Sequence, residues 1–148
     1  MKKTIGIIGA GNMGGAMYKI WKQSHLARRV YIYDRHVDKL KALKAGSDAL
    51  SLQNLLTRSE VIILAVKPQS FKDLTREIKI KKENKLIVSV MAGVSTRSIS
   101  ALLGVKKVAR VMPNMPARIG QGVSGWFAGK GVTKAEKTEM ARLFSALG

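Results

Sequence analysis

Three glycines with a fixed spacing are the first residues of this sequence whose arrangement suggests chemistry. They directly follow an apolar run at residues 4–8 and open a run with helical spacing at residues 13–22. In a strand–turn–helix unit, the first glycine permits a tight turn, the second lets a diphosphate approach the backbone, and the third allows close packing of helix and strand. The positive end of the helix dipole then faces the phosphates. We therefore predict a dinucleotide-binding turn at residues 9–14, which read Gly9-Ala10-Gly11-Asn12-Met13-Gly14.

Two neighbouring residues bear on which nucleotide this turn would take. Asp34 ends a second apolar run at residues 30–33, and an acid at such a strand end accepts a hydrogen bond from the adenosine 2′-hydroxyl of NAD. Arg35 follows immediately, and a guanidinium can hold the 2′-phosphate of NADP in a fork. The two residues favour opposite nucleotides. The sequence thus predicts NAD(H) or NADP(H) and does not choose between them.

Apolar runs of strand length alternate with segments of helical spacing along the whole chain. We expect strands at residues 4–8, 30–33, 61–66, 86–90, 107–112 and 123–127, and helices at residues 13–22, 37–43, 52–58, 70–80, 96–103 and 132–147. Strands that are apolar throughout are buried on both faces, as in parallel sheets covered by helices. The sequence therefore predicts one α/β domain over residues 1–148, with the doubly wound, mainly parallel sheet of a Rossmann-type NAD(P)-binding domain.

Three further segments follow expected strands and complete a recognisable set. They are Ala65-Val66-Lys67-Pro68, Met91-Ala92-Gly93-Val94 and Met112-Pro113-Asn114-Met115-Pro116-Ala117. In this order, and together with residues 9–14, they make the chain resemble the pyrroline-5-carboxylate reductase family from residue 3 to residue 148. Related β-hydroxyacid dehydrogenases share the glycine turn but carry an Asp-x-Pro-Val-Ser-Gly-Gly type segment where this chain has residues 110–116.

The resemblance implies an NAD(P)H-dependent oxidoreductase of proline biosynthesis. Hydride would pass from the nicotinamide to the imine carbon of a small cyclic substrate, 1-pyrroline-5-carboxylate, and give L-proline. The resemblance also implies that residues 65–68 and 91–93 border the nicotinamide and its ribose. Lys67 could add charge to the site and Asn114 could position the substrate, although an ordinary strand-end lysine and turn asparagine fit equally well. The sequence assigns no catalytic residue.

The chain departs from the family pattern at two places. Met115 stands where the family usually has threonine. The sequence also ends where family members continue into a helical domain that dimerises and completes the substrate pocket. We therefore expect a missing second domain and very low turnover by this chain alone. We also expect self-association through an uncovered apolar stripe on the last helix, made of Met140, Leu143, Phe144 and Leu147.

Composition narrows the remaining classes of function. The chain is 46% apolar and 24% charged and contains no cysteine, which excludes disulfides and cysteine-bound metal. We predict no metal site, no membrane segment and a cytoplasmic location. The net charge of +18 raises nucleic acid as a partner, but the basic residues are spread along the chain. We interpret their densest cluster, residues 79–85, as a helix end and loop, and we do not expect nucleic-acid binding.

Two alternatives to a pyrroline-5-carboxylate reductase stay open. One is a module that binds NAD(P) and catalyses nothing, and the other is another NAD(P)-dependent reductase of the same superfamily.

Overall fold

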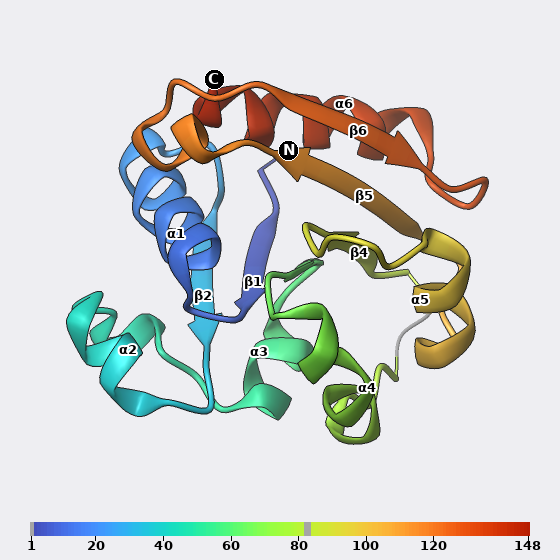
Figure 1. The fold of residues 1–148 in the computed structure, drawn as a ribbon, viewed down its shortest axis with the longest axis horizontal. Coiled ribbons are helices and arrows are strands. Elements are labelled where there is room, and N and C mark those ends of the chain that lie inside the picture. Colours follow the sequence, from blue (N-terminus) through green and yellow to red (C-terminus); the bar gives the residue numbers. More distant parts are fainter. Residues whose placement is uncertain (1, 82–83) are drawn as a thin grey trace.

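A single sheet forms the centre of the fold, in a computed structural model that describes residues 2–81 and 84–148. Within those residues its strand order is β2-β1-β3-β4-β5-β6. Strands β1 to β5 are parallel, and β6 pairs antiparallel with β5 (Figure 1). The strands are β1 Thr4–Ile8, β2 Arg29–Tyr33, β3 Val61–Leu64, β4 Leu86–Ser89, β5 Val108–Pro113 and β6 Ser124–Ala128.

Helices cover both faces of this sheet. They are α1 Asn12–Ser24, α2 Val37–Ala42, α3 Leu52–Arg58, α4 Pro68–Glu77, α5 Thr96–Leu103 and α6 Lys134–Phe144. Short 3-10 helices occupy η1 Gly46–Asp48, η2 Met115–Ile119 and η3 Ser145–Leu147. Helices α1 and α6 pack on one face, and α3, α4 and α5 pack on the other (Figure 1). The predicted fold class, a doubly wound and mainly parallel sheet, is confirmed.

The apolar strands account for this layering. Ile5 and Ile63 belong to the core beneath α1 and α6, whereas Ile62 and Leu64 belong to the core beneath α3, α4 and α5. Successive side chains of a strand point to opposite faces, so a strand that is apolar throughout contributes to both cores. This burial holds the carboxyl ends of β1, β2 and β3 together at one edge, where the predicted site residues lie.

Helix α6 is covered by the chain itself. Met140, Leu143, Phe144 and Leu147 are all buried. The indole Nε1 of Trp21 in α1 donates to the carbonyl oxygen of Leu143 at 2.7 Å, and the rings of Trp21 and Phe144 meet edge to face with centroids 5.3 Å apart. The expectation of an uncovered stripe is therefore wrong, because α6 packs across α1 on the same face of the sheet.

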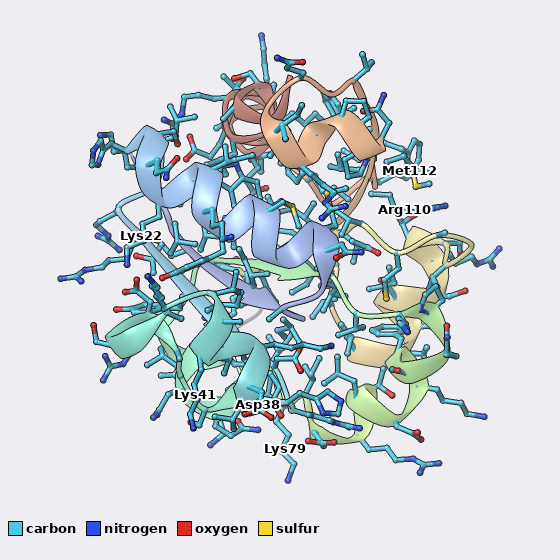
Figure 2. All side chains as sticks on the ribbon, turned by 60° about the vertical axis from the view of Figure 1, so that its left-hand side comes forward. Lys22, Asp38, Lys41, Lys79, Arg110 and Met112 are labelled. Carbon is cyan, nitrogen blue, oxygen red and sulfur yellow. The ribbon has the colours of Figure 1, made fainter. Side chains whose placement is uncertain are left out.

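Three of the large apolar side chains that are exposed lie on the last two strands. Met112, Trp126 and Phe127 are all exposed. Figure 2 shows Met112 projecting from β5 beside Arg110, whose Nη2 donates to the Met112 sulfur at 3.5 Å.

The basic side chains lie on several elements. Lys79 extends outward from the loop after α4 (Figure 2). The basic cluster at residues 79–85 includes residues 82–83, which lie outside the described residues.

Among the described helices, none is long and apolar enough to cross a membrane.

Two glutamate side chains join separate segments of the chain near the amino ends of the strands, opposite the predicted site. Glu60 accepts hydrogen bonds from the Thr4 backbone and from Lys3 and Arg28 at 2.9–3.0 Å. Glu136 accepts from Lys107 at 2.8 Å and from Thr133. Burial raises the pKa of each carboxyl, but the hydrogen bonds outweigh burial and hold both pKa values below the ordinary 4.5.

We expect Glu60→Gln and Glu136→Gln to weaken the dependence of stability on acid pH. A carboxyl whose pKa is lower in the folded state stabilises fully above its unfolded pKa and loses that contribution as pH falls through the folded value. Stability of the unaltered chain should therefore decline below about pH 4.5. Urea unfolding between pH 7 and pH 3 measures the slope. Asp38→Asn, at an exposed carboxylate outside both clusters, controls for the loss of one acidic side chain. An unchanged slope in both glutamine variants would contradict the assignment.

Candidate functional site

Close contact between β1, β3 and α1 defines the glycine turn, residues 9–14. Gly9 has a φ of +108°, a conformation that favours glycine, and its N–H donates to the Tyr33 carbonyl at 2.8 Å. A Cβ added at Gly9 would lie 2.5 Å from the Ala65 carbonyl oxygen, and one at Gly14 would lie 1.9 Å from the Gly9 carbonyl oxygen. Side chains are therefore excluded at both positions by backbone.

Gly11 has a different environment from these two glycines. It is the N-cap of α1, and a Cβ added there would meet nothing within 4 Å. No side chain of the described residues caps α1, and its first turn carries no acid. The side chains of Ser51, Ser95 and Thr133 cap α3, α5 and α6, whereas α2 and α4 share with α1 the lack of a side-chain cap. The first amides of α1 lack intrahelical partners, so this end of the helix suits an anion.

A first pocket, which we call the β2–β3 pocket, lies beside the turn. Its cavity volume is about 310 Å³. It brings together seven of the predicted residues, namely Gly9, Gly11, Asp34, Arg35, Ala65, Val66 and Lys67. The pocket is also lined by four residues that were not predicted at the site, namely Tyr33, His36, Lys39 and Ser70. The carboxyl ends of β1, β2 and β3 thus form one wall, the position expected for ligands in this class of sheet.

A second hollow, the α1–α2 pocket, lies on the other side of the turn, and its cavity volume is about 850 Å³. Ala10, Gly11 and Asn12 line it together with the cationic Lys19, Lys39 and Arg118. Its described lining contains no carboxylate. Gly11 lines both pockets, so an anion at the turn would have positive charge beside it.

The remaining predicted residues lie outside both pockets. Met13, Gly14 and Pro68 do not line them. Neither do Met91, which is buried in the core, and Ala92 and Gly93, which are exposed after β4. The side-chain oxygen of Asn114 accepts from the Val123 N–H at 3.0 Å and so ties η2 to the start of β6. The side chain of Met115 lies outside the described residues.

Asp34 and Arg35 are both engaged within the chain. One carboxylate oxygen of Asp34 accepts from the Ala10 N–H at 2.8 Å and the other from the His36 N–H at 2.8 Å. The guanidinium of Arg35 pairs with Glu77 at the end of α4. The sequence did not predict either arrangement, because the hydrogen-bond donors to Asp34 are backbone N–H groups and Glu77 lies 42 positions from Arg35.

Metal binding has no support from the described residues, where no group of three His, Cys, Asp or Glu side chains is placed to hold an ion.

The sheet order, the two-sided helix layers and the glycine turn between β1 and α1 define a Rossmann-type dinucleotide-binding fold. Residues 4–93 match the family described as NADP oxidoreductase coenzyme F420-dependent. The chain belongs to this family.

Individual relatives support the resemblance seen in the sequence. The chain is 35% identical to the pyrroline-5-carboxylate reductase of Haemophilus influenzae, over 99% of this chain and 56% of that protein. The crystal structure of 1-pyrroline-5-carboxylate reductase from Streptococcus pyogenes is 27% identical with a TM-score of 0.85, over 99% of this chain and 56% of that one. The corresponding enzyme structure from Coxiella burnetii is 26% identical with a TM-score of 0.88, over 100% and 57%. The chain spans about half the length of these relatives.

We expect Gly14→Ala to destabilise the domain, because the new methyl group would meet the Gly9 carbonyl. Overpacking against backbone should lower the free energy of unfolding by about 2 kcal/mol or more. Gly11→Ala is the matched control, since its methyl group enters open space, and should cost about 1 kcal/mol or less as an N-cap change. Urea unfolding measures both variants. Equal stabilities would contradict the close contact of turn and helix.

Proposed function

We propose that this chain binds NAD(P)H at the glycine turn and acts as the cofactor domain of a reductase that converts 1-pyrroline-5-carboxylate to L-proline. The carrying observation is the uncapped amino end of α1, with open space at Gly11 between two pockets. The curated relatives named pyrroline-5-carboxylate reductase support the substrate. When bound, the nicotinamide would supply the hydride.

The residues of the chain fit such a nucleotide. The amides of residues 11–13 would receive the diphosphate, because no capping side chain competes for them among the described residues. The β2 side of the β2–β3 pocket, formed by Asp34 and Arg35, would hold the adenosine end. Residues 65–68 and 91–93 follow β3 and β4 on the side of the turn away from β2, and we assign them to the nicotinamide end, as the resemblance implies.

Asn114 is the residue considered for substrate positioning. Asn114 is retained as a candidate substrate contact, although its side-chain oxygen already accepts from Val123. Holding two reactants in a reactive geometry can account for about 7–11 kcal/mol of an activation barrier. We propose that residues 1–148 by themselves bind cofactor and reduce the imine slowly, because their candidate substrate contact, Asn114, is already engaged with Val123. A module that binds NAD(P) without catalysis is the second candidate, and the same engagement of Asn114 favours it.

The remaining expectations concern the location of the protein and its self-association. A cytoplasmic location stays in the proposal, which fits a cysteine-free chain. Self-association through α6 does not, because its apolar stripe is buried against α1.

We expect Gly11→Val to weaken NADPH and NADH binding at least about tenfold, which is about 1.4 kcal/mol. Its side chain would occupy the space left for the diphosphate, while the fold has room for it. Gly125→Val is the matched control, because a Cβ at Gly125 also meets nothing within 4 Å and β6 does not line either pocket. Fluorescence titration measures binding, and thermal unfolding verifies the fold of both variants.

Two results would overturn the proposal. Unchanged binding by Gly11→Val would remove the glycine turn from the site, and no binding of either nucleotide by the unaltered chain would remove the cofactor. An assay with the imine and NADPH separates slow reduction from ordinary turnover, and ordinary turnover would refute the statement that the chain alone is slow.

A further inference from the structure

We infer that Glu77, and not Asp34, is the acidic side chain that limits the preference of this site for NADPH over NADH, and that it acts by occupying Arg35. This inference rests on the proposed function. It assigns a specificity role to a residue that does not line either pocket beside the glycine turn.

Asp34 is poorly placed to read the nucleotide. Its side chain is only 10% exposed, and each carboxylate oxygen already accepts a backbone N–H, from Ala10 or His36. The ammonium group of Lys39 lies 3.8 Å from one of these oxygens. An acid selects NAD by binding the 2′-hydroxyl and repelling a 2′-phosphate. Here its charge is compensated and its oxygens support the turn, so Asp34 discriminates weakly.

The rest of the β2–β3 pocket favours a phosphate. Arg35, Lys39 and Lys67 line it, and Asp34 is the one acid in its described lining. A guanidinium can bind a phosphate through two parallel hydrogen bonds. Arg35 and Lys39, which follow β2 at the adenosine end of this pocket, would therefore attract the 2′-phosphate that distinguishes NADPH from NADH.

Glu77 opposes that attraction through its ion pair with Arg35. The pair joins the end of β2 to the last residue of α4, and the Glu77 carbonyl also accepts from the Gln53 side chain at 2.9 Å. The Glu77 carboxylate occupies the Nη2 atom of Arg35 and offsets part of its charge, so a 2′-phosphate would compete with it for the guanidinium. NADH has no such group and leaves the pair intact. Because both side chains are 48% exposed, solvent weakens the pair and the effect should be a few-fold.

The test compares Glu77→Gln with Asp73→Asn in NADPH and NADH titrations of the whole chain. Asp73 lies on the same helix and is paired only with the exposed Arg76 among the described residues, so its removal controls for a general change in charge. We expect Glu77→Gln to tighten NADPH binding about two- to fivefold and to leave NADH unchanged. Asp73→Asn should leave the ratio of the two dissociation constants unchanged.

Two further variants test whether Glu77 acts through Arg35 and whether Asp34 takes part in selecting the nucleotide. Arg35→Ala should weaken NADPH more than NADH, and in that background Glu77→Gln should have no effect on the ratio. Asp34→Asn should weaken both nucleotides alike, because it loosens the turn.

Three outcomes would overturn the inference while both nucleotides still bind the unaltered chain. They are an unchanged ratio in Glu77→Gln, the same gain in Asp73→Asn, and a selective gain for NADPH in Asp34→Asn. Failure of the unaltered chain to bind either nucleotide would instead refute the proposed function. Thermal unfolding of each variant excludes loss of fold as the cause.

Discussion

The close approach of β1, β3 and the first turn of α1 is the constraint on which the site depends. The carbonyl oxygen of Gly9 fills the space that a side chain at Gly14 would need, so the helix axis passes close to the sheet edge. Gly9 in turn accommodates a positive φ next to the Ala65 carbonyl. With α1 held at this distance, its amino end at Gly11 borders both the β2–β3 pocket and the α1–α2 pocket.

Other parts of the fold serve to hold that arrangement. The indole of Trp21 anchors α1 to α6 through the Leu143 carbonyl, and Asp34 ties the end of β2 to the Ala10 N–H. At the opposite edge, Glu60, which directly precedes β3, accepts from the Thr4 backbone at the start of β1 and pairs with Lys3 and Arg28.

The sequence predicted local features well and long-range contacts poorly. Helix α3 has the predicted bounds, and α5 begins after the Ser95 cap and ends at Gly104 with a left-handed backbone, because caps and apolar periodicity act within a few residues. The antiparallel direction of β6, the burial of the α6 stripe and the Arg35–Glu77 pair were not predicted. Each depends on residues far apart in the chain. Seven predicted site residues do meet in one pocket, because parallel strands place their carboxyl ends at one edge.

Amide chemical shifts of the ¹⁵N-labelled chain during titration with NADPH would test the central claim most directly. If the bare turn receives the diphosphate, the largest shifts belong to the amides of Gly11, Asn12 and Met13, with smaller shifts around Arg35. Unmoved turn amides, with the main shifts around Glu60 at the opposite edge of the sheet, would contradict it.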